Sequence, residues 1–192
     1  MTDNLQTIGA VENPPDPART IEGLRDTGYR FETAIADIID NSIAAKASVV
    51  DLKITMDYGG NIRVSIADDG IGMNRDELIN AMRYGSPARP DPSSLGKFGM
   101  GLKTASTAFC RRLSVTSRSS GEMAPLKATW DLDHVVGTGK WELLLSEPSS
   151  EEQKHLDEIA PGHSGTVVVW EKVDRLLKSY ANPGGKHARN AL

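Results

Sequence analysis

The spacing of apolar residues predicts one amphipathic helix near the start of the chain. Between residues 31 and 46, four isoleucines recur at helical spacing, at Ile35, Ile38, Ile39 and Ile43. This spacing places them on one side of a helix of about four turns. Asp37, Asp40 and Asn41 lie on the opposite side, which is therefore polar.

A β-hairpin and a second helix are expected next. Residues 49–56 and 61–67 are apolar-rich runs, and the glycines at 59 and 60 between them can adopt the positive φ of a tight turn. A helix is predicted over residues 74–84, because Asn74 can act as its N-cap and Glu77 follows three positions later, as in a capping box.

Strands dominate the second half of the chain, with helices between them. Residues 85–95 are rich in Pro and Ser and favour a loop, and residues 99–109 favour a helix. Further strands are predicted at 112–118, 124–132, 141–145 and 165–170, and a helix at 150–159. This order of elements predicts an α+β domain.

The two ends of the chain have a different composition. Residues 1–20 contain three prolines and few apolar side chains, which predicts an extended N-terminal arm. Residues 21–172 form the predicted domain. Residues 173–192 predict a short helix at 174–180 and then a tail of linker composition, which we expect to lead into a further region of a longer protein.

Composition and charge narrow the class of protein. The chain has 192 residues, of which 39% are hydrophobic and 25% charged, and this is the composition of one globular domain. Its net charge of -4 does not support a free-standing nucleic-acid binder, although it leaves a domain of a larger DNA-acting protein open. No apolar run approaches the roughly 20 residues that cross a bilayer, and no signal peptide precedes the domain, so no membrane is expected.

Cysteine and histidine usage argues against disulfides and metal clusters. Cys110 is the single cysteine, and the four histidines show no metal-ligand spacing. A reducing compartment is therefore favoured over secretion, and the cytoplasm is the expected location.

The first helix carries a pair of residues suited to chemistry. Asp37 and Asn41 are four positions apart and project from one face. A carboxylate can accept a proton from an attacking water, and an amide oxygen is a ligand suited to Mg²⁺. Considered alone, this helix is better explained by a solvated polar face.

Two glycine motifs follow. Asp68 ends a predicted strand just before Gly70 and Gly72, which permit a tight backbone path against a flat ligand, and Met73 can line the same slot or fill the core. Considered alone, this pattern also fits an ordinary turn.

The second motif, from Gly96 to Lys103, opens the helix expected at 99–109. Backbone N–H groups at a glycine-rich helix start bind phosphate oxygens, and Lys97 and Lys103 can add cationic contacts. A P-loop is disfavoured because Leu102 stands between Gly101 and Lys103, and a dinucleotide fingerprint is disfavoured because the third glycine and the preceding strand are missing.

The order of these three motifs resembles the GHKL ATPases, a family of gyrase B subunits, ninety-kilodalton heat-shock chaperones, sensor histidine kinases, MutL proteins and MORC proteins. The resemblance covers about residues 21–172 and is strongest to bacterial chaperone-like or MORC-like ATPase domains. It implies a two-layer α/β sandwich of the Bergerat type, with a mixed, mostly antiparallel sheet and helices on one face.

The resemblance also implies ATP and Mg²⁺ as ligands and assigns residue roles. Asp37 would be the catalytic base, Asn41 the magnesium ligand, and Asp68 the acceptor of the adenine amine, supported by Thr166. The other implied nucleotide contacts are Gly70, Gly72, Met73, Gly96, Lys97, Phe98, Gly99, Met100, Gly101, Leu102 and Lys103. The loop at 85–95 matches the segment that closes over ATP in the family.

Two positions depart from the family pattern. Asp37 stands where relatives usually carry Glu, so its reach is one methylene shorter, and Ala44 stands where many relatives carry another acid. We therefore expect slow hydrolysis.

Three functions remain open at this point. The first is an ATPase that acts as a conformational or homodimerisation switch, with an unknown downstream domain or client. The second is a nucleotide-sensing interaction module with little or no hydrolysis. The third is a histidine-kinase-type phosphotransfer domain, which is disfavoured because residues 1–30 contain no histidine.

Overall fold

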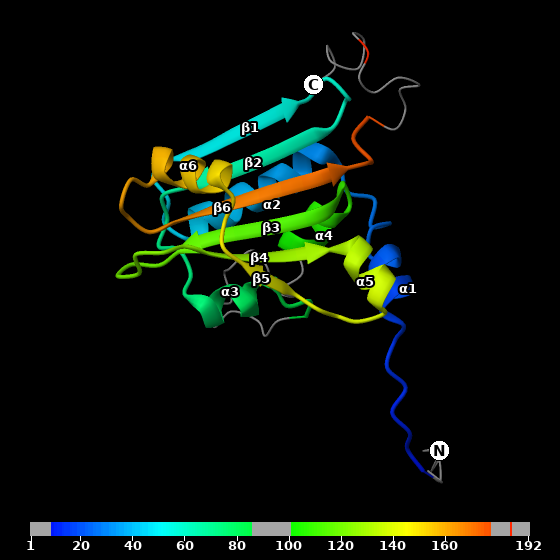
Figure 1. The fold of residues 1–192 in the computed structure, drawn as a ribbon. Coiled ribbons are helices and arrows are strands. Elements are labelled where there is room, and N and C mark those ends of the chain that lie inside the picture. The colour runs from blue at the N-terminus through cyan, green and yellow to red at the C-terminus, as the bar shows by residue number, and fades with distance from the viewer. Residues whose placement is uncertain (1–8, 86–100, 178–184, 186–192) are drawn as a thin grey trace, which may run out of the picture.

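The computed structural model describes residues 9–85, 101–177 and 185. Within these residues, six strands form one sheet in the order β1-β2-β6-β3-β4-β5 (Figure 1). The strands are β1 (Val50–Met56), β2 (Ile62–Asp68), β3 (Cys110–Arg118), β4 (Leu126–Asp131), β5 (Leu144–Ser146) and β6 (Gly165–Val173). Each neighbouring pair is antiparallel, so the described sheet is antiparallel throughout, where a mixed one was expected.

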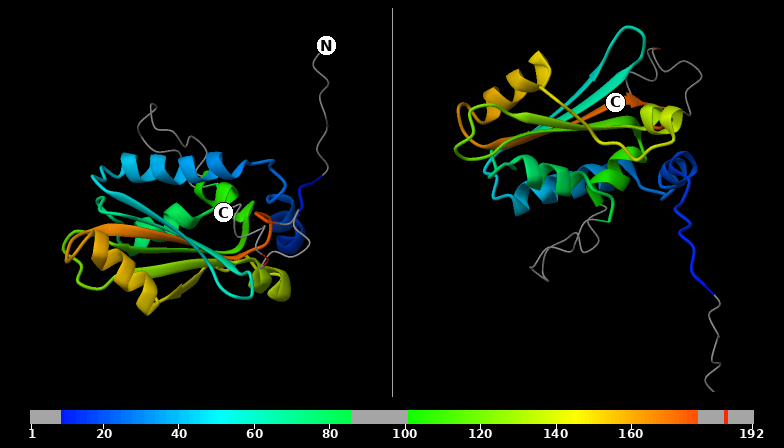
Figure 2. Two further views of the ribbon diagram at one scale, coloured as in Figure 1. Left: turned by 90° about the horizontal axis from the view of Figure 1, so that it is seen from above. Right: turned by 60° about the horizontal axis from the view of Figure 1, so that its bottom comes forward.

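Helices cover both faces of this sheet, but one face carries more of them than the other. The helices of the described residues are α1 (Pro17–Gly23), α2 (Phe31–Ala44), α3 (Arg75–Met82), α4 (Gly101–Thr107), α5 (Leu132–Thr138) and α6 (Ser150–Ile159). Figure 2 shows α2, α3 and α4 together on one face and α6 on the other. The expected α+β sandwich is confirmed, and α6 adds partial cover to the face that was expected to lack helices.

The larger core lies under α2, α3 and α4. It contains Ile38 of α2, Leu78 of α3 and the strand residues Ile66, Leu113 and Trp170, all at most 1% exposed. A smaller cluster under α6 joins Leu156 to Val167 and Val169. The six-stranded sheet is thus buried on both sides where α6 crosses it, which explains why nearly all residues of β2 and most residues of β6 are buried.

Local sequence signals explain several boundaries. Asn74 and Glu77 form the predicted capping box at the start of α3. Ser149 and Glu152 form an equivalent box at the start of α6, whose observed bounds agree with the predicted ones.

Three expectations about local structure were wrong. Residues 17–20 belong to α1 rather than to an extended arm, because Asp16 caps the helix through the Arg19 N–H at 2.8 Å and Pro17 occupies its first turn. Residues 9–16 do lack regular structure (Figure 1). The α5 helix was not predicted, and residues 174–177 are not helical.

No helix in the described part of the chain combines the length and apolarity needed to cross a lipid bilayer.

Candidate nucleotide site

The predicted pair lies on α2, where Asp37 faces the start of α4. Asn41 donates its Nδ2 hydrogen to the Asp37 carbonyl oxygen at 2.8 Å, which fixes the amide on the helix surface. A Cβ built on Gly101 would lie 4.0 Å from Oδ2 of Asp37, so the carboxylate lies beside the first residue of α4. Both side chains are half-buried. Glu32, near the start of the same helix, is exposed and pairs with Arg30 at 3.5 Å.

Tyr29 is a neighbour of Asp37 that sequence reasoning missed. Burial raises the pKa of Tyr29, and the Asp37 carboxylate raises that pKa further. The Thr104 hydroxyl on α4 has the opposite effect on it. Asp37 is therefore bordered by a phenol that precedes α2, and this phenol also interacts with a hydroxyl from α4.

Asp68 is a buried carboxylate held by two hydrogen bonds. It is 5% exposed at the end of β2. Its Oδ2 accepts a hydrogen bond from Ser42 Oγ at 2.8 Å, and its Oδ1 accepts one from the Gly70 N–H at 3.0 Å. Burial raises the pKa of Asp68, and these two hydrogen bonds oppose that rise. Ser42 was also missed, although it directly follows Asn41.

The glycines after Asp68 allow a close approach of backbone segments. A Cβ on Gly72 would lie 2.0 Å from the Arg118 carbonyl oxygen, and its φ of 64° is in the left-handed region. A Cβ on Gly70 would lie 2.9 Å from the Ala45 carbonyl oxygen. Only glycine fits at these positions, so the turn is pressed between α2 and the ends of β3 and β6.

Thr166 is brought beside Asp68 by strand pairing. The two residues are direct partners in the β2–β6 ladder. The Oγ1 of Thr166 lies 2.9 Å from the Oγ of Ser117 on β3, and Ser117 Oγ also accepts a hydrogen bond from the Met73 N–H at 2.9 Å. Ser117 is a third residue that sequence reasoning missed, since nothing in the pattern of β3 distinguishes it from other strand serines.

The glycine-rich motif is only partly within the described residues. Gly96, Lys97, Phe98, Gly99 and Met100 lie outside them, as does most of the loop expected at 85–95. Gly101 and Leu102 begin α4, and Leu102 packs against the core. Lys103 is 2% exposed, and its Nζ donates to the Ala81 carbonyl oxygen of α3 at 2.8 Å. This contact directs the ammonium group toward α3.

The donor set on α2 fits a magnesium ion that is shared with phosphates. Among the described residues, no three His, Cys, Asp or Glu side chains form a metal cluster. Mg²⁺ in nucleotide sites takes one or two protein oxygens and completes its shell with phosphates and water. Because the Asn41 amide nitrogen is held by Asp37, its oxygen is the atom available as that ligand.

A second group of residues has the composition of a hydrolase triad but not its arrangement. His155 on α6 contacts Ser65 Oγ through Nδ1 at 2.7 Å and Asp51 Oδ2 through Nε2 at 2.8 Å. In a serine hydrolase the two ring nitrogens have the reverse partners, and the serine must reach substrate. Ser65 is 3% exposed in the middle of β2, so this group joins α6 to the sheet.

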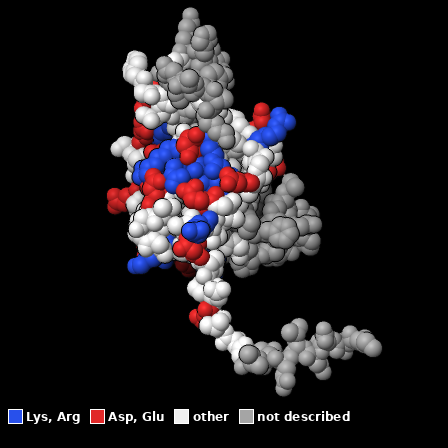
Figure 3. All heavy atoms as spheres, turned by 90° about the vertical axis from the view of Figure 1, so that its right-hand side faces the viewer, with Lys and Arg blue, Asp and Glu red and all other residues white. Residues whose placement is uncertain are grey.

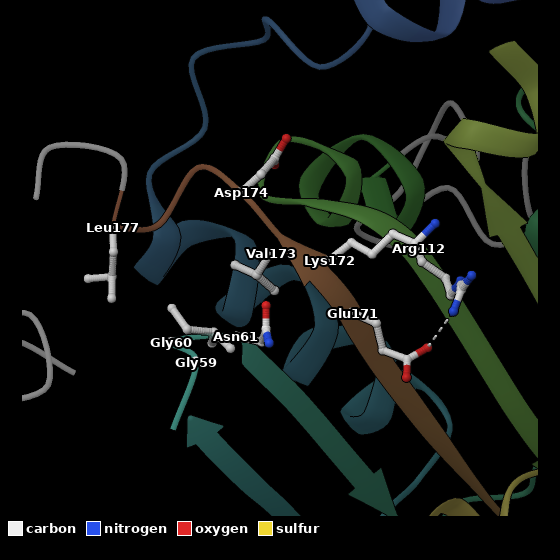
Figure 4. Close-up of a pocket in the computed structure, with 10 residues that line it drawn as sticks. Gly59, Gly60, Asn61, Arg112, Glu171, Lys172, Val173, Asp174 and Leu177 are labelled. Atoms are coloured by element: carbon white, nitrogen blue, oxygen red, sulfur yellow. Dashed lines mark ion pairs between the residues drawn. The ribbon is translucent and has the colours of Figure 1, made fainter. Parts of the chain in front are cut away.

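Another hollow lies at the far end of the sheet from Asp68. Figure 4 shows this cavity, of about 450 Å³, between the β1–β2 turn at Gly60 and the ends of β3 and β6. Arg112 and Glu171 lie side by side at its edge, as partners in the β3–β6 ladder, with 3.9 Å between their charged groups, and Arg112 also pairs with Asp131 at 2.7 Å. The cavity contains none of the predicted site residues.

Basic side chains gather on the face formed by α1 and α5, where acidic side chains surround them (Figure 3). Arg111 pairs with Glu22 and with Asp133, both at 2.7 Å. These carboxylates neutralise the cations they contact, so the cluster is not an open basic surface for a polyanion.

Comparison with known proteins identifies the class to which this site belongs. A model of the family described as histidine kinase-, DNA gyrase B- and HSP90-like ATPases matches residues 29–166, and the chain belongs to this family. The resemblance drawn from the motifs is thereby confirmed. Membership supports an ATP-binding domain of ATPase type.

Individual relatives include MORC ATPases and MutL proteins. ATPase MORC2B of Mus musculus is 28% identical over 97 residues, which cover 48% of this chain and 10% of that protein. ATPase morc-1 of Caenorhabditis elegans is 32% identical over 95 residues, or 49% of this chain and 11% of that protein. DNA mismatch repair protein MutL of Halobacterium salinarum is 33% identical over 129 residues, or 64% of this chain and 18% of that protein. The chain thus matches less than a fifth of the length of these relatives.

Proposed function

We propose that this domain binds ATP with Mg²⁺ and hydrolyses it slowly, with Asp37 as the base that activates water. Asp68 and Thr166 would receive the adenine, Gly70, Gly72 and Met73 would form the wall of its slot, and Asn41 would hold the metal. Magnesium bound there would offset the charge of the phosphates. The observation that carries the proposal is the buried Asp68 carboxylate beside Thr166, at one end of a helix-covered sheet whose α2 presents Asp37 and Asn41.

The structure supports Asp37 in spite of its short side chain. Its carboxylate lies against the start of α4, the helix that follows the glycine-rich motif. A general base must lie within hydrogen-bonding reach of the water it activates. The proximity of α2 to α4 would partly offset the missing methylene, because it holds the Asp37 carboxylate beside the helix that follows the glycine-rich motif.

We further propose that nucleotide acts as a conformational or dimerisation switch, with the glycine-rich residues from Gly96 to Gly101 contacting the phosphates. The domain would work within a longer protein in the cytoplasm. Cys110 is a free thiol, which supports that compartment because reducing conditions keep cysteines unpaired.

Calorimetry and phosphate release test the proposal together. We expect Mg²⁺-ATP to bind to the wild-type protein and to Asp37→Ala with similar affinity, whereas Asp37→Ala should release phosphate at least tenfold more slowly, since a general base contributes about 10²–10⁴-fold. Asp37→Glu restores the usual acid of the family and should raise the rate. Glu32→Ala removes an exposed carboxylate of the same helix and should change neither quantity.

Two outcomes would contradict this account in different ways. Absence of ATP binding to a folded wild-type protein would reject the nucleotide site. Equal phosphate release by the wild type and Asp37→Ala, with binding intact, would reject Asp37 as the base. The second result would favour the nucleotide-sensing module, for which the short acid and the exposed Ala44 are the supporting features.

A further inference from the structure

Ser117 is a fully buried hydroxyl in the same row of the sheet as Asp68 and Thr166. Asp68 pairs with Thr166 across β2 and β6, and Thr166 pairs with Ser117 across β6 and β3. Direct partners in adjacent strands project to the same face of a sheet. The three polar side chains therefore lie side by side on the face that also carries α2, and Ser117 is 0% exposed there.

The contacts of Ser117 restrict which atoms can accept its single hydroxyl hydrogen. A serine hydroxyl has one hydrogen to donate and two lone pairs to accept with. One lone pair accepts the Met73 N–H at 2.9 Å. The hydrogen can be donated either to the Gly165 carbonyl oxygen at 3.1 Å or to Thr166 Oγ1 at 2.9 Å.

These two choices give Thr166 opposite roles. If Ser117 donates to Gly165, Thr166 must donate to Ser117 and offers only lone pairs elsewhere. If Ser117 donates to Thr166, the hydrogen of Thr166 is available for a ligand. The orientation of one buried hydroxyl thus decides whether the group beside Asp68 is a hydrogen-bond donor or an acceptor.

The purine bases distinguish between the two states. The pairing edge of adenine presents an amine donor next to the ring nitrogen N1, which is an acceptor, whereas guanine presents a carbonyl acceptor next to an N–H donor. Asp68 in its ionised form only accepts. A donor hydroxyl beside Asp68 is therefore complementary to adenine, and the same pair places two acceptors together if guanine enters.

We propose that Ser117 is a positioning residue that orients the Thr166 hydroxyl as a donor to N1 of adenine, so that the N–H group of guanine at this position would meet a second donor. This inference rests on the proposed ATP site. Ser117 itself would not touch the nucleotide, because its side chain is 0% exposed and its hydroxyl contacts Met73, Gly165 and Thr166.

A pair of nucleotides isolates this contact. 1-Deaza-ATP keeps the amine that Asp68 would accept but replaces N1 with a C–H group, so it removes the acceptor for Thr166 alone. We expect the wild-type protein to bind Mg²⁺-ATP about tenfold more tightly than Mg²⁺-1-deaza-ATP by calorimetry, as one net hydrogen bond implies. Ser117→Ala should reduce this ratio to about threefold or less, and Thr166→Val should reduce it to about one.

Ser114→Ala is the matched control. Ser114 lies on the same strand, is 1% exposed, and has its Oγ 2.9 Å from Thr129 Oγ1, so the mutation removes the same kind of buried hydroxyl pair. The Ser114 side chain projects from the opposite face of the sheet, so Ser114→Ala should keep the tenfold ratio. Because each ratio compares two ligands on one variant, a general loss of stability cancels. If Ser117→Ala does not fold, Ser117→Cys, with its weak thiol donor, is expected to show the same reduced ratio.

The inference and the proposed function fail separately. If the wild type binds both nucleotides equally well, or if Ser117→Ala keeps the wild-type ratio, the role of Ser117 is refuted while ATP binding stands. If the folded wild type binds neither nucleotide, the proposed function is refuted first.

Discussion

At the scale of single residues, the buried carboxylate of the candidate site lowers the stability of the fold, whereas the carboxylate next to it in the sequence raises that stability. Asp68 is a carboxylate removed from water, and burial raises its pKa in spite of the hydrogen bonds from Ser42 and Gly70. Its neighbour Asp69 is more exposed and accepts the N–H groups of Ser48 and Val49 at 2.7 and 2.8 Å, which lower its pKa. Adjacent acids of one motif thus have opposite effects on stability.

Asp68→Asn should therefore stabilise the protein and weaken ATP binding. A raised pKa in the folded state means that the ionised form costs stability above that pKa, and the cost disappears below about pH 4, where the unfolded chain is also protonated. We expect a gain of about 1 kcal/mol in the free energy of unfolding at pH 7, falling toward zero as the pH is lowered to 4, by urea denaturation. ATP affinity should fall at least tenfold, because a charge-assisted hydrogen bond is lost.

Asp69→Asn is a control for which we expect the opposite change in stability. Its lowered pKa stabilises the folded protein above the unfolded pKa, and this stabilisation is lost as the pH falls through the folded value. The variant should therefore be less stable than the wild type at pH 7. A loss of stability in Asp68→Asn at pH 7 would show that its hydrogen bonds outweigh its burial.

At the scale of elements, the sequence predicted what depends on local spacing. The isoleucine spacing located α2, the capping residues located α3 and α6, and the glycines located the β1–β2 turn. The helices α1 and α5 were missed because seven residues make only two turns, too few for a periodic pattern. Their Asp caps, Asp16 and Asp131, are the signals that were present.

The candidate site likewise contains residues that the sequence predicted and residues that only the fold reveals. Asp37, Asn41, Asp68 and the glycines stand in motifs, so their sequence order identified them. Ser42, Ser117 and Tyr29 act through partners that only the fold brings near, such as the β3–β6 register that places Ser117 beside Thr166. A lone hydroxyl in a strand carries no local signal of such a partner.

The docking of α6 on the sheet gives a prediction at this scale. His155 is 4% exposed and is hydrogen-bonded at both nitrogens, to Ser65 and Asp51. His155→Leu leaves the buried Ser65 hydroxyl without its partner, so we expect a loss of about 2–3 kcal/mol in chemical denaturation. His134→Leu breaks a more exposed pair with Glu142 at 2.9 Å and should cost less than about 1 kcal/mol. Equal losses would mean that the buried contacts of α6 contribute no more than a surface pair.

At the scale of the whole molecule, Arg25 connects three distant parts of the chain. Its guanidinium donates to the Thr107 carbonyl oxygen at the end of α4, 82 positions away, and pairs with Asp174, 149 positions away. The side chain is 2% exposed. The segment after α1, the helix that begins at Gly101 beside Asp37, and the chain leaving β6 therefore meet at one cation.

Arg25→Met should destabilise the entire domain rather than one edge. The substitution keeps the aliphatic bulk but leaves the Thr107 carbonyl and Asp174 without the guanidinium. Breaking a buried pair by removing one partner costs about 3–5 kcal/mol, and because Asp174 is 39% exposed and can be hydrated, we expect about 2–3 kcal/mol. In hydrogen exchange, this loss should appear equally in the slowest amides of β2, β3 and β6, which report global unfolding.

Arg175→Met provides the comparison. Arg175 contacts the Arg25 carbonyl oxygen at 2.9 Å and Asp26 at 2.8 Å, but Asp26 is 73% exposed and neither contact reaches α4. Its loss should stay below about 1 kcal/mol and be confined to the ends of the domain. If Arg25→Met likewise affects only residues near 25 and 174, the three segments are stabilised independently, and α4 is held by its other contacts with α2, α3 and β3.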